Sequence, residues 1–549
     1  LVISGLAGCG SSASTESAQT VPAGTETESS VQKSSEAVNK TGYPIMNEDY
    51  TFKIVYAVGS TDKIGGWENK DFVKKIEEDT GLKIQWVGIP EASYNDQVAI
   101  MIAAGDLPDA FIGQIPNFAQ FLDSFVKMND MIDDYAPSLK EFFDKYPNIK
   151  LAGMFPDGSV YGLPEVQLDG YVAGKSLAIN KKWLDFLGLK VPETTEELEK
   201  VLIAFRDHAE ELKSEFDIEG DVIPMSFIIN NGDQDPAILI NGFGEGYGDT
   251  GDHFAVTDEG KVIYTTVQEG YKEGIQWLHE LVEQKLVDPE AFTQEWSTYV
   301  AKGKSHRYGL CFTWDISNID NYEDYVMLPA LAGPNGLVNI TRQNNSETSG
   351  FDRGRCVLTT SCKNTALAAA WIDQMYAPLQ SPQNNWGTYG EKDSFNIFEM
   401  GTNKDGEKML KHMDLGNESP VEVREAQSVN GPLAVLNEYY DVYVTQPADA
   451  KWRLDNMHET YLEDMHSKYV YPNVFMSIED TNKVTQYDTD IRKYAEQKKA
   501  DWILNGGIEK EWDSYLKKME QYGLSDYLAI KQKYFDKYQE SLKSEQGKE

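Results

Sequence analysis

The sequence lacks the residue patterns that commonly mark a catalytic centre. It has no G-x-S-x-G nucleophile turn, no H-E-x-x-H zinc pair and no G-x-x-x-x-G-K-[ST] phosphate loop. The stretch from Gly246 to Gly251 fits G-x-G-x-x-G by letter, but it follows no predicted strand and opens no predicted helix. The seven histidines show no metal-ligand spacing, and no pair of carboxylates stands out as acid and base. We therefore expect a binding protein without a cofactor or a metal, and not an enzyme.

Cys9 ends an N-terminal stretch, LVISGLAGC, that has the pattern of a bacterial lipobox. Small residues before the cysteine admit a signal peptidase, and the Cys9 thiol would accept a diacylglyceryl group. Residues 10–42 are rich in Ser, Thr, Glu, Ala and Gln, which cannot bury enough surface to fold, so they are expected to form a flexible tether. The pattern predicts a lipid-anchored protein on the extracellular face of a bacterial cytoplasmic membrane. The alternative is an apolar terminus with a chance cysteine.

Composition narrows the class of partner further. The chain has 549 residues and a formal net charge of −39, with 89 acidic against 50 basic residues. Such a balance repels nucleic-acid phosphates and anionic lipid headgroups, so no nucleic-acid partner is expected. The remaining cysteines, Cys311, Cys356 and Cys362, are too few for a disulfide framework. Cys356 and Cys362 could pair, although two buried free thiols are the favoured interpretation.

The folded part is predicted to begin with alternating strands and helices near residue 50. TFKIVYAV, KIQWVGI and DAFIG have the composition of strands, and DFVKKIEEDT between the first two places Phe72, Val73 and Ile76 on one helix face before Gly81. This alternation predicts a parallel sheet with right-handed crossovers. Ligands of such sheets lie beyond the carboxyl ends of the strands, where residues 59–67 and 113–118 are expected.

Several segments resemble the extracellular solute-binding proteins of carbohydrate ABC transporters. They are AGDLPD (104–109), DGSVYGLP (157–164), the block at 177–205, whose PETT (192–195) is similar to the Pro-Thr-Thr turn of the family, and KNTALAAAWIDQMY (363–376). The resemblance implies an α/β, two-lobed, type II periplasmic-binding-protein-like fold with hinge crossings and extra C-terminal helices. It also implies a monomer that captures an extracellular oligosaccharide by hinge closure and delivers it to an ABC transporter permease.

The resemblance also implies domain boundaries. Residues 1–9 are the signal remnant and residues 10–42 the tether. The first lobe is expected to hold 43–172 plus about 356–415, and the second 173–355 plus about 416–549. Members of the family often carry a calcium loop after the Pro-Thr-Thr helix, but KSEFDIEGDVIP lacks the required glycine and asparagine spacing, so no metal is predicted.

A sugar site combines aromatic faces, which stack on C–H groups, with polar side chains that bind hydroxyl groups. The resemblance places Trp314, at a strand end, in such a cleft. It also places there Trp386 of a glycine-bracketed loop, together with Tyr389 and Glu391 from the same loop. Either tryptophan could instead belong to a core.

Other candidate ligand contacts follow from position. Asp62 and Trp67 lie in the loop after the first strand, and Asn230 follows a strand end in the second lobe. Arg353 and Arg355 flank the return crossing, where a guanidinium could bind hydroxyls or a carboxylate, or pair with acids; Arg355 is the candidate retained. Open alternatives are a peptide or an acidic uronide on the same scaffold, or an extracellular glycoside hydrolase.

Overall fold

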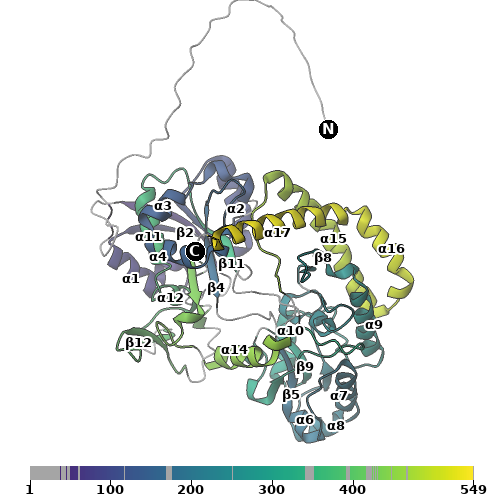
Figure 1. Ribbon diagram of the computed structural model, residues 1–549. Coiled ribbons are helices and arrows are strands. Elements are labelled where there is room, and N and C mark those ends of the chain that lie inside the picture. The colour runs from purple at the N-terminus through teal and green to yellow at the C-terminus, as the bar shows by residue number, and fades with distance from the viewer. Residues whose placement is uncertain are drawn as a thin grey trace, which may run out of the picture.

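The computed structural model shows two α/β lobes joined side by side, with long helices at the C-terminal end of the chain (Figure 1). The structure describes residues 38, 45, 50–59, 62, 64–115, 118–168, 176–249, 251–313, 315–340, 351–390, 396–415, 423–424, 426, 428–429, 431–446, 448–464 and 468–547. Within these ranges no helix is both long and apolar enough to cross a membrane. The two lobes confirm the predicted two-lobed α/β architecture.

The first lobe is built on a six-stranded sheet. Its strands lie in the order β14 (Leu433–Leu436), β4 (Gly162–Leu168), β11 (Phe351–Leu358), β3 (Ala110–Ile112), β1 (Thr51–Val58) and β2 (Lys83–Pro90). β1 is parallel to β2 and β3, as the strand–helix alternation predicts, and β11 runs antiparallel between β3 and β4.

Helices cover this sheet with apolar faces that the sequence pattern anticipates. α1 (Asp71–Thr80) buries Phe72, Val73 and Ile76 and ends at Gly81, whose φ of 70° suits glycine. The other elements of this lobe are α2 (Glu91–Ala104), α3 (Asn129–Tyr135), α4 (Pro137–Lys145), α5 (Pro147–Ala152), α11 (Thr365–Gln374), α12 (Ser381–Trp386) and the hairpin of β12 (Phe398–Thr402) and β13 (Lys408–His412).

The second lobe contains a four-stranded sheet and a separate hairpin. The sheet order is β10 (Tyr325–Met327), β5 (Ser176–Asn180), β9 (Tyr308–Thr313) and β6 (Ile223–Met225); the hairpin pairs β7 (Phe254–Val256) with β8 (Val262–Tyr264). Its helices are α6 (Lys181–Leu187), α7 (Thr195–Asp207), α8 (Ala209–Glu215), α9 (Glu269–Glu283), α10 (Trp296–Lys304) and α14 (Ala448–Tyr461). Thr194 caps the N-terminus of α7 directly after Pro192 and Glu193, because its side chain accepts a hydrogen bond from the Glu197 amide.

The predicted lobe boundary near residue 415 is wrong. Leu433–Leu436 forms β14, which pairs with β4, and Val444 is buried in the core of the first lobe. β11 also belongs wholly to the first sheet, so the return crossing precedes residue 351. The first lobe therefore extends to about residue 446, because this short apolar strand completes its sheet rather than that of the second lobe.

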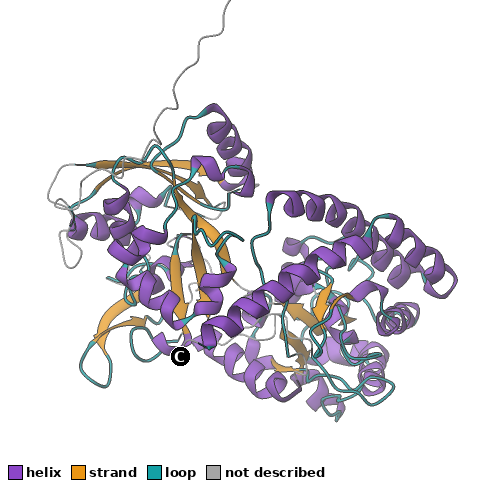
Figure 2. Cartoon of the chain, turned by 45° about the horizontal axis from the view of Figure 1, so that its top comes forward, coloured by secondary structure: helices purple, strands orange, loops and turns teal. Residues whose placement is uncertain are grey.

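The C-terminal helices are α15 (Ile478–Asn505), α16 (Ile508–Gln521) and α17 (Leu524–Gln546), and they do not belong to the second lobe alone. Trp502 of α15 and Tyr527 of α17 lie in the core of the second lobe, whereas Tyr534 and Tyr538 of α17 lie in that of the first. α17 runs from one lobe to the other in both views (Figures 1 and 2). The predicted extra helices are present, and α17 braces the two lobes.

Candidate functional site

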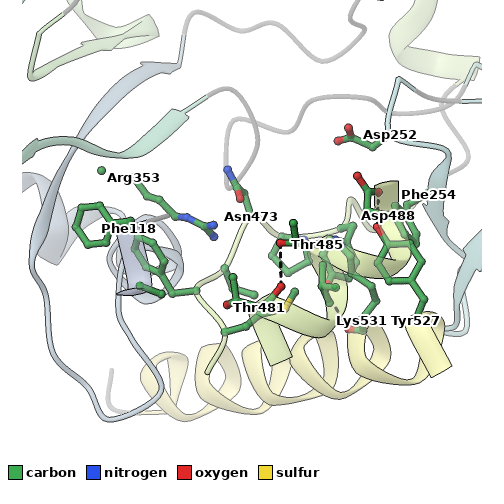
Figure 3. A pocket seen from close by; sticks show the side chains of 18 of the residues that line it. Phe118, Asp252, Phe254, Arg353, Asn473, Thr481, Thr485, Asp488, Tyr527 and Lys531 are labelled. Carbon is green, nitrogen blue, oxygen red and sulfur yellow. Dashed lines mark hydrogen bonds between the residues drawn. The ribbon is translucent and has the colours of Figure 1, made fainter. Parts of the chain in front are cut away.

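A cavity of about 1030 Å³ lies where the two lobes and the C-terminal helices meet. Figure 3 shows side chains from all three parts pointing into it. The first lobe contributes residues 114–115, 118–120 and 352–354, and the second contributes 251–252 and 254–256. The remaining wall consists of the extended segment 469–476, one face of α15, and residues Tyr527 and Lys531 of α17.

The wall from the first lobe begins at the carboxyl end of β3. Gly113 has a φ of 143°, and a Cβ at this position would lie 2.7 Å from the Tyr94 ring, so only glycine lets the chain turn here without strain. The following Gln114 and Ile115 line the cavity, as does Phe118. The prediction that residues 113–118 lie at a ligand-binding edge of the sheet is consistent with this geometry. In the described part of the chain, residues 59–67 do not line this cavity.

Arg353 stands on a stack of aromatic rings at this end of the cavity. Its guanidinium carbon lies 4.1 Å from the ring centroid of Phe475, which stacks on Phe155 at 4.2 Å and on Phe118 at 5.4 Å. The Nη1 atom of Arg353 is buried, and no described residue provides it with a hydrogen-bond acceptor. Burial lowers the pKa of Arg353 to about 10, which keeps the side chain charged at neutral pH. Arg353 thus presents a positioned and unsatisfied donor.

Lys531 provides a second cation at the other end. Its ammonium nitrogen lies 4.7 Å from the ring centroid of Phe254, 4.8 Å from that of Tyr471 and 5.6 Å from that of Tyr527. Burial lowers the pKa of Lys531 to about 8, because the charged form loses hydration that the rings replace only in part.

The carboxylates of the cavity have cationic partners. Arg492 lies 3.2 Å from Asp488 and 3.3 Å from Asp252, and the Tyr527 hydroxyl donates to Asp488 at 2.6 Å. Asp352 lies 3.4 Å from Arg355. Among the described residues that line the cavity, three are acids and three are cations: Asp252, Asp352, Asp488, Arg353, Arg492 and Lys531. This described lining has no net formal charge, in contrast to the strongly acidic chain as a whole.

α15 supplies a polar face between these two ends. Thr481, Thr485 and Thr489 are spaced four residues apart and so lie on one side of the helix, where all three line the cavity. The Thr485 hydroxyl donates to the Thr481 carbonyl at 2.9 Å, and the Thr489 hydroxyl donates to the Thr485 carbonyl at 2.8 Å. Because their protons are used within the helix, these two hydroxyl oxygens face the cavity as acceptors.

Two predicted stacking residues are core residues instead. Trp67 is 3% exposed and packs against Tyr56 and Trp86, with ring centroids 4.9 and 5.3 Å away. Trp386 is buried against Phe398 and His412. Their assignment to the ligand cleft is corrected here.

The geometry explains both errors. The loop after β1 folds back as a short helical turn at Trp67–Asn69 that inserts the indole into the core of the first lobe. Gly387, with a φ of 117°, terminates α12 directly after Trp386, so this tryptophan is the last residue of a packed helix rather than part of a binding loop.

The other predicted contacts that the structure describes lie outside this cavity lining. Asp62 pairs with Lys70 at 3.3 Å, and the Tyr389 ring lies under the ammonium of Lys75 at 3.7 Å. Asn230 is exposed in the second lobe.

Arg355 lies beside the cavity and pairs with Glu165 at 2.7 Å, as one of the predicted alternatives had it. Ligand contact by Asp62, Tyr389, Asn230 and Arg355 stays a prediction. Trp314, Glu391 and Cys9 lie outside the described residues.

Sequence reasoning missed the C-terminal wall of the cavity. One signal was present: the Thr-x-x-x-Thr-x-x-x-Thr spacing from 481 to 489 places hydroxyl groups on one helix face. Nothing in the sequence showed that this face and Lys531 would meet the return strand of the first lobe.

The described residues contain no group of three or more His, Cys, Asp or Glu side chains arranged to hold a metal ion. In the stretch where the family calcium loop would lie, the Arg307 Nε donates to the Asp221 carbonyl at 2.9 Å. The predicted lack of a metal and of a cofactor stays a prediction.

Known proteins that are similar to this chain are solute-binding proteins. The family model described as "Bacterial extracellular solute-binding protein" matches residues 59–378, more than half of the chain. The fructooligosaccharide ABC transporter substrate-binding protein FusA of Streptococcus pneumoniae is 41% identical over 482 residues, which cover 86% of this chain and 87% of that protein.

Solved structures give the same picture. The S. pneumoniae FusA complex with kestose is 40% identical, has a TM-score of 0.80, and aligns over 90% of this chain and 100% of that chain. A solute-binding protein from Bifidobacterium longum infantis, described as binding human milk oligosaccharides (HMO), has a TM-score of 0.76 at 24% identity and aligns over 90% of this chain and 99% of that chain, which supports the fold. These relatives are binding proteins of transport systems, not enzymes.

Proposed function

Because the chain belongs to the family of bacterial extracellular solute-binding proteins, we propose that it binds a neutral oligosaccharide of the fructooligosaccharide class between its lobes. It then delivers this ligand to the permease of an ABC transporter. The observation that carries the proposal is the likeness to the kestose-bound FusA structure, which extends over the whole of that chain at 40% identity.

The chemistry of the cavity supports a neutral ligand. The described lining combines aromatic rings, among them Phe118, Phe475 and Tyr471, with threonine, asparagine and glutamine side chains that offer hydrogen bonds. In the described part of the lining three carboxylates match three cations, so an acidic uronide would meet as much repulsion as attraction from these residues. A neutral sugar chain carries no net charge, so these charged side chains do not repel it.

We infer that the ligand is bound by hinge closure, because both lobes contribute residues to the cavity lining. Phe118 and Arg353 belong to the first lobe, Phe254 to the second, and the segment 469–476 passes between them. A ligand that contacts both lobes binds the closed arrangement more tightly than the open one, and this difference in affinity shifts the population toward closure. Transport then needs no covalent step in this protein.

The proposal includes a lipid anchor at Cys9 and a monomeric state. The lipobox-like residues and the tether composition support an anchor that holds the binding lobes near the permease. Mass spectrometry of the protein expressed in a Gram-positive host behind a lipoprotein signal peptide would test this. A diacylglyceryl adduct on Cys9, and release to the medium on Cys9→Ala, are expected; an unmodified wild-type Cys9 would refute the anchor.

The ligand class is tested with a panel of oligosaccharides. Thermal shift and tryptophan fluorescence are followed with kestose, with a galacturonate oligomer and with a maltodextrin, while product release is monitored by chromatography. Saturable stabilisation by kestose without hydrolysis is the expected result. Preference for the uronide, or turnover of any sugar, would refute the proposed function.

A further inference from the structure

Given the proposed function, we propose that Arg353 is the specificity-determining donor of the cavity. Its guanidinium donates hydrogen bonds to hydroxyl oxygens of the sugar, and the same hydroxyl groups donate to the threonine oxygens of α15. The inference deepens the proposed function by naming the residues that distinguish a polyhydroxylated neutral ligand from a charged one.

The Nη1 atom of Arg353 is buried and has no hydrogen-bond acceptor among the residues that the structure describes. The adjacent carboxylate, Asp352, is already engaged, because it lies 3.4 Å from Arg355 and accepts from the Gly354 amide at 2.9 Å. A buried charged donor without a partner is unfavourable, and a ligand oxygen that reaches Nη1 when the lobes move relative to each other removes that penalty. The gain from binding is therefore larger than for a donor that water already satisfies.

The position of the guanidinium is fixed before the ligand arrives. It stacks on Phe475, and Phe475 is held by Phe155 and Phe118. Gly162 on β4 allows the backbone of Arg353 to approach closely, since a Cβ there would lie 2.7 Å from the Arg353 carbonyl oxygen. A planar fork held in this way loses little rotamer freedom on binding, which a lysine at the same place could not match.

The guanidinium points toward the α15 face that carries Thr481 and Thr485 (Figure 3). The Thr485 proton is committed to the Thr481 carbonyl, so its oxygen accepts from the ligand. A sugar hydroxyl is both acceptor and donor, and it can satisfy Arg353 and a threonine oxygen together. A carboxylate accepts only; it would satisfy Arg353 but would face the threonine oxygens and Asp488 unfavourably. The pairing of a donor wall with an acceptor wall therefore selects hydroxyl groups.

Calorimetric titration of the full chain with kestose tests this inference. Arg353→Lys keeps the charge and removes the fork, and Arg353→Gln removes the charge; each is expected to weaken kestose binding at least tenfold. Thr485→Val keeps the shape and removes the acceptor, and is expected to weaken binding about threefold. In the double variant Arg353→Lys/Thr485→Val the two losses should combine to less than their product, because one hydroxyl group serves both residues.

Matched controls separate recognition from folding. Arg206→Lys, at a half-buried position, and Thr298→Val, at an exposed one, make the same chemical changes in the second lobe outside the cavity lining and should leave kestose affinity unchanged. The melting temperature of ligand-free Arg353→Gln should equal or exceed that of the wild type, because the variant no longer buries an unpaired charge.

Wild-type affinity in Arg353→Lys and Arg353→Gln would overturn the inference while leaving the proposed function intact. Equal losses in the variants and in their controls would also overturn it. A wild type that binds no kestose would instead refute the proposed function.

Discussion

Lys499 is the positive centre of a buried ionic cluster that fixes α15 to the second lobe. Its Nζ lies 2.9 Å from Asp235 and 3.4 Å from Asp249, and its side chain is 4% exposed. Asp249 also accepts from the Thr265 hydroxyl at 2.6 Å and contacts His253 at 2.8 Å. We predict that Lys499→Met, which keeps the length of the side chain and removes its charge, destabilises this lobe strongly.

The size of the effect follows from leaving two carboxylates buried without their cation. Removing one partner of a buried ion pair costs about 3–5 kcal/mol. In a unit of this size each kcal/mol lowers the melting temperature by roughly 2–4 °C, so a fall of about 6–20 °C is expected.

The acid dependence of stability should change as well. Burial alone would raise the pKa of Asp249, but the charges of His253 and Lys499 outweigh it and hold that pKa well below its usual range. This contribution to stability is present above the unfolded pKa of about 4 and is lost as pH falls toward the folded value. Without Lys499 the depression shrinks, so the stability of the variant should fall less steeply below pH 4 than that of the wild type.

Differential scanning calorimetry from pH 3 to 7 measures both effects. Lys493→Met serves as the control, since Lys493 is exposed on the same helix and its loss should change stability by less than about 0.5 kcal/mol. If Lys499→Met melts within about 2 °C of the wild type at pH 7, the cluster does not stabilise the lobe and the reasoning is refuted.

Three further predictions concern the cavity and its supports. The pKa of Lys531 is lowered to about 8, so a ligand whose oxygen accepts from this ammonium should bind more weakly as pH rises from 7 to 9.5. The expected loss is about fivefold, which corresponds to a hydrogen bond on the order of 1 kcal/mol. Kestose titrations of Lys531→Met should show no such pH dependence, and an equal dependence in that variant would contradict the assignment. Trp386→Phe should lower the melting temperature yet leave kestose affinity within about twofold of the wild type, because the indole packs in the core of the first lobe; a large affinity loss would return Trp386 to the ligand site. Tyr538→Ala should release the end of α17 from the first lobe, where Tyr538 is buried and donates to the Asn148 carbonyl; hydrogen exchange should accelerate over residues 533–546, and unchanged protection there would argue against the brace.

The sequence pattern predicted those parts of the fold that depend on residues close together in the chain. The apolar face of α1, its end at Gly81 and the parallel strands β1 to β3 all follow from periodicity and turn chemistry. The place of Gln114 and Ile115 at a cavity beyond the carboxyl end of β3 follows from strand direction, because parallel strands place their carboxyl ends together. These features depend on residues that are near one another in the chain.

Long-range packing was not predictable in the same way. The apolar run Leu433–Leu436 has the composition of a strand, but only its pairing with β4 shows that it belongs to the first lobe. An aromatic residue in a loop, such as Trp67, has the same local pattern whether its ring enters a core or a cleft. The tyrosines of α17 predict a buried face, yet nothing local shows that Tyr527 packs in one lobe and Tyr538 in the other.

The central claim is that this chain binds a neutral fructooligosaccharide between its lobes. Isothermal titration of the purified wild-type protein with kestose, with a galacturonate oligomer as the matched acidic ligand, tests it most directly. The account predicts saturable binding of kestose at one site per chain and no detectable heat with the galacturonate oligomer. Binding of the galacturonate oligomer in preference to kestose, or no binding of kestose, would contradict it.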